Sequence, residues 1–206
     1  MQSLSDLAMT DTIQKPHLQV VVASTRPGRK GALVGAWALE QALAHGGFTV
    51  ELVDLAEVAL PMFDEPNHPI LGRYEHAHTR AWSELASKAD AYVFVTPEYD
   101  HAPPAALLNA LQYLVKEWAY KPVGFVSYGA VAGGTRAVQL LKPVVTALRM
   151  MPIPEGVVIP FFTKSIDSET GAFDPGEIQE RGARAMLDEL KRWAEALSSL
   201  RARQPA

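Results

Sequence analysis

Five short apolar runs recur along the chain, and each is followed by a segment with helical spacing. The runs are 19–23, 48–53, 91–95, 123–127 and 156–160. Most are apolar at successive positions and rich in β-branched or aromatic residues, which is typical of strands buried on both faces. Such strands alternate with helices when a parallel sheet is covered on both sides. The sequence therefore predicts an α/β fold with a doubly wound, five-stranded parallel sheet.

Helical spacing and helix-ending residues place the connections between these strands. A run rich in Ala and Leu ends at Gly46-Gly47, and Pro104 suits the first turn of another helix. The expected helices are 33–45, 79–88, a stretch from near Pro104 to Trp118, and two stretches with apolar faces from Val138 to Leu148 and from Met186 to Leu197.

Length and composition fit one globular domain. The chain has 206 residues, of which 48% are hydrophobic and 20% charged, enough apolar side chain for a substantial core. We expect residues 1–16 to form a poorly ordered N-terminal tail and residues 17–206 to form the single domain.

The residue types that are missing exclude several functions. Without cysteine there are no disulfides, thiolate metal sites or thiol catalysis, and the chain suits the cytoplasm. The net charge of -4 offers no basic surface to nucleic acid. Apolar runs stay well below the ~18 residues of a membrane span. We expect neither nucleic acid nor membrane as a partner.

Three unusual loops follow the first, third and fourth expected strands. Ligands of doubly wound sheets bind beyond the carboxyl ends of the strands, so these loops are the first candidates for a site. Loop 24–31 combines hydroxyls, Arg26, glycines and a helix start, whose free N–H groups favour an anion. It predicts a phosphate site, although it matches neither the P-loop nor the dinucleotide fingerprint. A turn with solvated charges is the alternative.

The other two loops suit the border of a flat ring. Loop 96–104 carries Tyr99 between prolines, which restrict the backbone that could face a heterocycle. Loop 127–135 carries glycines that leave room for a planar ligand. Taken singly, each loop is equally consistent with an ordinary strand-to-helix connection.

Together these loops resemble the NAD(P)H-dependent FMN reductase family of the flavodoxin-like fold. The matching segments are 24–29, 97–99, 108–114 with Glu117-Trp118 and Lys121-Pro122, and Ser127-Tyr128-Gly129 with Gly133 and Arg136-Ala137. They extend in order over roughly residues 20–160. The resemblance implies strand order 2-1-3-4-5, FMN as cofactor, and NADPH or NADH as hydride donor.

The resemblance also implies which residues contact FMN. The phosphate would be held by Ser24, Arg26 and Arg29, with the backbone around Gly28 and Gly31. The isoalloxazine ring would be lined by Pro97, Glu98, Tyr99, Asp100 and His101, and its other edge closed by Ser127, Tyr128, Gly129, Gly133 and Gly134. The family usually has Asn in place of Asp100, and an acid there could lower the flavin potential. No residue is assigned a catalytic acid–base role, because the cofactor carries the chemistry.

The implied reaction passes a hydride from NAD(P)H to bound FMN and on to a flavin, quinone or other small acceptor. Homodimers and homotetramers are usual in the family, with Trp118 and the irregular stretch 61–74 as candidate contacts between copies. Two alternatives remain: an electron carrier without NAD(P)H oxidase activity, and a flavin-free binding module. We expect no metal site, because His76 and His78 are two apart and would not share a helix face.

Overall fold

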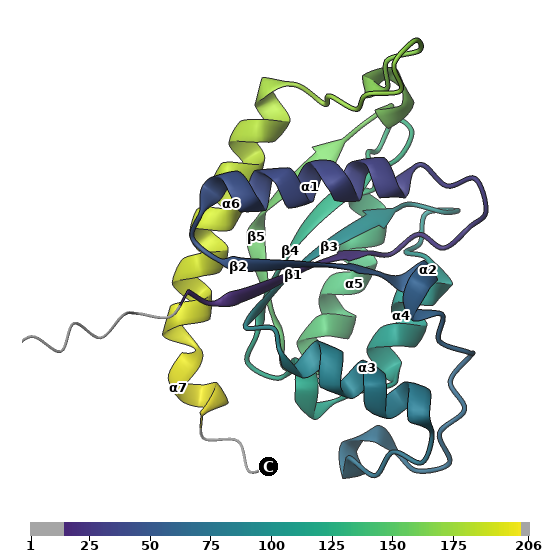
Figure 1. The fold of residues 1–206 in the computed structure, drawn as a ribbon, viewed down its shortest axis with the longest axis vertical. Coiled ribbons are helices and arrows are strands. Elements are labelled where there is room, and N and C mark those ends of the chain that lie inside the picture. Colours follow the sequence, from purple (N-terminus) through teal and green to yellow (C-terminus); the bar gives the residue numbers. More distant parts are fainter. Residues whose placement is uncertain (1–14, 203–206) are drawn as a thin grey trace, which may run out of the picture.

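Five parallel strands form one sheet in the order β2-β1-β3-β4-β5 (Figure 1). The computed structural model describes residues 15–202, so residues 1–14 of the expected tail lie outside the described residues. The strands are β1 (His17–Val22), β2 (Thr49–Asp54), β3 (Ala91–Pro97), β4 (Pro122–Tyr128) and β5 (Met151–Ile159). Their order and direction confirm the expected doubly wound sheet.

Helices cover both faces of the sheet (Figure 1). On one face lie α1 (Gly31–His45) and α6 (Glu177–Ala196), and on the other α3 (Ala77–Ser87), α4 (Ala105–Gln112) and α5 (Thr135–Ala147). The shorter elements are α2 (Leu55–Val58), α7 (Ser198–Arg201), and the 3₁₀ turns η2 (Pro69–Leu71), η3 (Lys116–Trp118) and η4 (Phe162–Ser165). An apolar core fills the space on each side of the sheet.

The central strands carry the pattern that the sequence predicted. Every residue of β3 and of β4 is buried, since both strands have neighbours in the sheet and helices on both faces. The edge strand β2 is partly exposed. Because all five strands run in parallel, the loops after their carboxyl ends emerge at the same edge of the sheet.

The expected continuous helix from Pro104 to Trp118 is wrong. Helix α4 ends at Gln112, and Trp118 lies in the separate turn η3. The indole N–H groups of Trp82 and Trp118 donate to the carbonyls of Ala110 and Leu111, at 2.9 and 3.1 Å. Carbonyls at a helix end need partners from outside the helix, and the two indoles supply them within the core.

Trp118 is therefore a core residue. Its side chain is only 1% exposed and packs against Trp82 and Tyr92, with ring centroids 5.8 and 5.2 Å away. The expectation that Trp118 contacts another copy of the chain is wrong. Its spacing with Leu107, Leu111 and Leu114 reflects burial against the same core.

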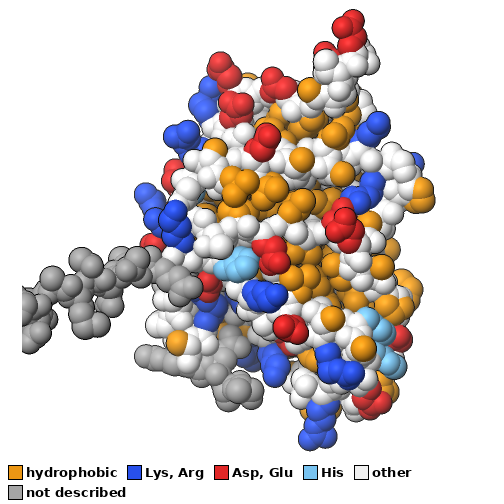
Figure 2. All heavy atoms as spheres, in the orientation of Figure 1, with side chains coloured by type: hydrophobic (Ala, Val, Ile, Leu, Met, Phe, Trp, Pro, Cys, Tyr) orange, Lys and Arg blue, Asp and Glu red, His pale blue; other side chains and the backbone are white. Residues whose placement is uncertain are grey.

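The surface carries both signs of charge. On the face shown in Figure 2, acidic and basic side chains are interspersed, with hydrophobic side chains between them. No continuous basic patch of the kind that binds nucleic acid is visible on that face. None of the helices within residues 15–202 combines the length and apolar character that crossing a membrane requires.

Candidate functional site

A cavity of about 510 Å³ lies beyond the carboxyl ends of the strands. Its volume is in the range of small-molecule and cofactor pockets. The residues that line it are Arg26, Gly28, Arg29, Lys30, Pro97, Glu98, Tyr99, Tyr128, Gly129, Ala130, Phe161, Phe162 and Thr163. The structure brings the three loops singled out in the sequence to one cavity and adds a fourth, which follows β5.

The loop after β1 is a tight turn that leads directly into α1. The Arg29 N–H donates to the Arg26 carbonyl at 3.1 Å, which closes a turn over Pro27 and Gly28. Gly28 has φ +70°, a left-handed conformation that favours glycine. A Pro-Gly pair is what a type II turn requires at its two central positions. The turn places Arg26 at the wall of the cavity.

Two long helices follow loops that line this cavity, α1 after loop 24–31 and α5 after loop 127–135, and only α5 has an acidic side chain at its start. At α5 the Glu98 carboxylate accepts the backbone N–H of Arg136 at 3.1 Å and its guanidinium Nε at 2.6 Å. Burial raises the pKa of Glu98, but these hydrogen bonds and the charge of Arg136 outweigh it and hold the pKa below 4.5. At α1 no side chain caps the helix and no acid lies in the first turn. The amides of α1 are therefore the ones open to an anion.

A buried hydroxyl without a partner lies beneath the same loop. Ser24 is 0% exposed, and its Oγ has no hydrogen-bond partner in the described part of the chain. A Cβ on Gly31 would collide with Ser24 Oγ and with the Tyr128 hydroxyl, so glycine leaves room for both oxygens. An uncapped helix start, an unpaired buried donor and Arg26 together fit a phosphate group.

Arg29 is held in the loop by an ion pair. Its Nη2 pairs with Asp54 Oδ2 at the end of β2, while its Nη1 is buried and has no partner among the described residues. The other oxygen of Asp54 accepts the Ala56 N–H at 3.0 Å and caps α2. One side of the Arg29 guanidinium is thus committed to anchoring the loop, and the other remains available to a ligand.

The loop after β3 folds back as a two-residue turn. The backbone groups of Tyr99 and Ala102 pair in both directions, at 2.9 and 2.8 Å. Between them Asp100 and His101 have φ +49° and +67°, the region that type I′ turns fill best with Asn-Gly. Both residues are exposed and neither lines the cavity, whereas Tyr99 does.

Tyr128 lines the cavity from the end of β4. Its side chain is 3% exposed, and its ring packs edge-on against Phe162 with centroids 4.8 Å apart. Burial raises the pKa of Tyr128 to about 12. Its hydroxyl reaches under the loop after β1, next to Gly31, so Tyr128 borders the end of the cavity nearest the start of α1.

Three of the expected residues shape the packing of α5 and do not line the cavity. The Ser127 hydroxyl is buried and donates to the Val157 carbonyl at 3.4 Å. Gly133 and Gly134 both have positive φ. A Cβ on Gly133 would lie 2.5 Å from Val158 Cγ1, and a Cβ on Gly134 would lie 2.8 Å from Ser127 Cβ. The glycines allow the start of α5 to lie against the strand ends.

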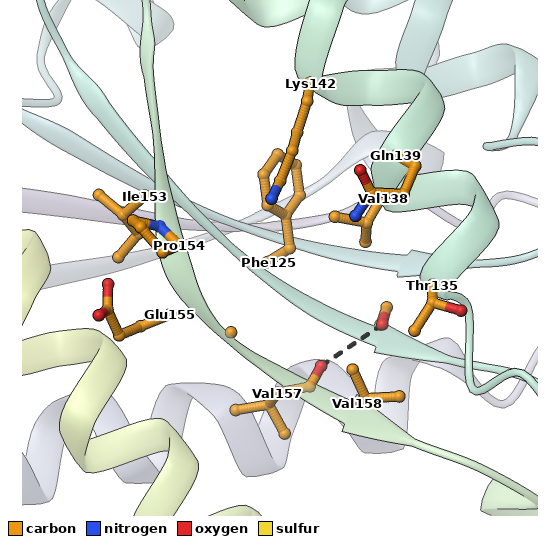
Figure 3. A pocket seen from close by; sticks show the side chains of 12 residues that line it. Phe125, Thr135, Val138, Gln139, Lys142, Ile153, Pro154, Glu155, Val157 and Val158 are labelled. Atoms are coloured by element: carbon orange, nitrogen blue, oxygen red, sulfur yellow. Dashed lines mark hydrogen bonds between the residues drawn. The ribbon is translucent and has the colours of Figure 1, made fainter.

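Ser127 also borders a second, smaller cavity. It measures about 140 Å³ and lies between α5 and β5. Figure 3 shows Lys142 and Gln139 reaching toward it from α5, and the Ser127 hydrogen bond ending at Val157. This smaller cavity touches only loop 127–135, at Ser127 and Thr135, and none of the other three loops, so the larger cavity is the candidate site.

The fourth loop was not predicted from the sequence. Phe161, Phe162 and Thr163 line the cavity directly after the end of β5, and Phe161 has φ +47°. The signal was present, because the rule that points to loops after strands one, three and four applies equally to strand five. Phe161 and Phe162 have no glycine beside them, and two adjacent aromatic residues are typical of a buried core, so the sequence did not indicate a binding loop here.

His76 and His78 form a small polar cluster with Asp64. His76 precedes α3, so its ring can stack on that of His78, with centroids 5.2 Å apart, contrary to the helical spacing assumed from the sequence. His78 Nε2 lies 3.0 Å from Asp64 Oδ1, and His76 Nε2 lies 3.1 Å from the Asp64 carbonyl. Within the described residues no group of His, Asp or Glu side chains is arranged to hold a metal ion.

Comparison with known proteins places the chain among flavin reductases. A family model described as NADPH-dependent FMN reductase matches residues 16–164. An NAD(P)H-dependent FMN reductase of Schizosaccharomyces pombe is 41% identical over 141 residues, which cover 68% of this chain and 70% of that protein. One from a Nectria species is 28% identical over 185 residues, covering 87% and 88%.

A solved structure supports the fold. The flavoenzyme NAD(P)H:(acceptor) oxidoreductase FerB from Paracoccus denitrificans superposes with a TM-score of 0.66 at 19% identity. The superposition covers 88% of this chain and 98% of FerB.

Proposed function

The chain belongs to the NADPH-dependent FMN reductase family, and on this premise we propose that FMN binds in the cavity beyond the strand ends with its phosphate at the start of α1. The main support for this placement is the unpaired Ser24 hydroxyl beneath the uncapped start of α1. A phosphate there would accept hydrogen bonds from the hydroxyl and from the free backbone N–H groups of the helix. Bound FMN supplies the hydride chemistry, while the protein binds and orients it.

Each loop has a separate task in this proposal. Arg26 and the free side of Arg29 neutralise the phosphate, while the amides of α1 hydrogen-bond it. Tyr99 and the backbone of Pro97 and Gly129 border the ring. Glu98 lies at the same wall, but its carboxylate is committed to α5, so it joins two loops and leaves the ring no acidic neighbour from this position.

An absorbance experiment tests the proposal. The purified protein is mixed with FMN, desalted, and titrated with NADPH without oxygen. We expect the flavin bands to stay with the protein and to bleach on addition of NADPH. Retained bands that resist NADPH would favour an electron carrier, and loss of the flavin on desalting would contradict the assignment of this cavity.

Preference for NADPH over NADH is expected to depend on Lys30. Lys30 lines the cavity and has no ion-pair partner in residues 15–202, so its charge is available for the 2′-phosphate that distinguishes NADPH. We expect Lys30→Ala to raise KM for NADPH about tenfold, the effect of one hydrogen bond to a charged group. KM for NADH should change little.

Steady-state kinetics with both nucleotides measure this preference. Lys88→Ala, at the far end of α3, is the matched control and should alter neither KM. If Lys30→Ala raises KM equally for NADPH and NADH, Lys30 contributes to FMN binding or to the stability of the fold and not to the choice of nucleotide.

The acceptor and the assembly complete the proposal. The electrons pass to a small acceptor such as a flavin or quinone, in the cytoplasm. The chain forms a homo-oligomer through the 61–72 segment, in which Met62, Ile70 and Leu71 are 75%, 66% and 56% exposed. Exposed apolar side chains gathered in one segment are typical of protein–protein contacts.

A further inference from the structure

Two hydroxyl groups face the same small space beneath the loop after β1, residues 24–31. Ser24 lies two residues beyond the end of β1, and Tyr128 is the last residue of β4. Both oxygens occupy the volume that a Cβ on Gly31 would need, at the first residue of α1. Strands β1 and β4 are separated by β3 in the sheet, so the Tyr128 side chain spans the width of β3 to bring its hydroxyl beside Gly31.

Neither side chain has freedom to move away. Ser24 is completely buried, and the Tyr128 ring is fixed edge-on by Phe162. The phenol also stays protonated across the working pH range, because burial raises the pKa of Tyr128 to about 12. Tyr128 therefore remains a hydrogen-bond donor at a fixed position.

We infer that Tyr128 is a positioning residue for the cofactor phosphate: when the phosphate binds, the Tyr128 hydroxyl turns to donate to Ser24 Oγ, which has no partner among the residues that the structure describes, and so directs the Ser24 O–H toward the phosphate and makes the site select flavins that carry a 5′-phosphate. The inference rests on the proposed function. A serine hydroxyl donates only one proton, so an incoming donor on its oxygen leaves that proton for the ligand. The arrangement also links the phosphate end of the cavity to the loop after β5 through Phe162.

The first test compares FMN with riboflavin, which lacks the phosphate, by titration of flavin fluorescence. We expect Tyr128→Phe to raise the Kd for FMN about tenfold, because the Ser24 O–H is no longer directed toward the charged phosphate and that hydrogen bond is lost, and to leave the Kd for riboflavin unchanged. Tyr74→Phe, whose hydroxyl bonds Glu117 away from the cavity, is the matched control and should change neither value. Equal weakening of both flavins by Tyr128→Phe would show a packing role and overturn the inference.

The second test asks whether Tyr128 acts through Ser24. In a double-mutant cycle on FMN affinity, Tyr128→Phe should have little further effect once Ser24→Ala is present. Additive losses would mean that the two hydroxyls act independently, which contradicts the proposed relay. Failure of the wild-type protein to bind FMN would refute the proposed function itself, whereas wild-type affinity in the Tyr128 variant would refute only the relay.

Discussion

The Gly31→Ala variant is expected to lose FMN binding by more than tenfold. The added Cβ would clash with the hydroxyl oxygens of Ser24 and Tyr128. Neither side chain can move aside, because both are buried. Overpacking of this kind costs typically about 1–3 kcal/mol of stability. Here the strain falls on the groups that are proposed to meet the phosphate. The measurement pairs chemical denaturation without flavin with a titration of FMN.

A second glycine of the same helix separates the two effects. A Cβ on Gly35 would collide with Val22 Cγ2, one turn further along α1 and away from the cavity. We expect Gly35→Ala to lose comparable stability and to keep its affinity for FMN. If Gly31→Ala binds FMN as tightly as the wild type, the space under the first turn of α1 is not part of the cofactor site.

The Trp118→Ala variant is expected to lose about 3–5 kcal/mol of stability, as large aromatic truncations in cores do. The indole is buried between Trp82 and Tyr92, and its N–H satisfies the carbonyl of Leu111 near the end of α4. Trp118→Phe removes the N–H and keeps most of the apolar contact, so we expect a smaller loss of about 1–2 kcal/mol. Urea denaturation of both variants measures the difference.

Oligomeric state distinguishes this core role from a contact between copies. Light scattering should give the wild-type assembly for Trp118→Phe. Ile70→Asp, at a side chain that is 66% exposed, should weaken the assembly with little change in monomer stability. Dissociation of the Trp118→Phe variant at unchanged stability would contradict the assignment of Trp118 to the core.

The strands were predictable because a strand that is buried on both faces has a continuous run of apolar residues. β3 and β4 contain almost nothing but apolar residues, and no helix of ordinary length fits between their flanking turns. β5 was placed at 156–160, yet it begins at Met151. Its first half contains Pro152 and Pro154, which argue against a central strand and are tolerated only at an edge or a bulge.

The site was less predictable than the fold, because its residues depend on which way side chains point between strands. The loops were found from their position at the strand ends. The sequence could not show that Glu98 turns to the start of α5, that Arg29 pairs with Asp54, or that Tyr128 reaches under α1. These contacts join segments at least 25 residues apart. The break after α4 was hidden in part for the same reason, since one of the two indoles that satisfy its last carbonyls, that of Trp82, lies 28 residues away in the sequence.

The open edge of β5 also limits how copies of this protein can associate. The Met151 N–H points inward to the Lys121 carbonyl, so the next residue, Pro152, faces the outer edge and offers no donor there. The pairing of β4 with β5 shifts register between Val123 and Phe125, where Pro154 lies in the bulged part of β5. An edge without regular donors is a poor template for an incoming strand. The first half of β5 is therefore poorly suited to pairing with a strand of a neighbouring copy, and at this edge only the regularly paired second half, residues 156–159, offers a regular row of backbone groups.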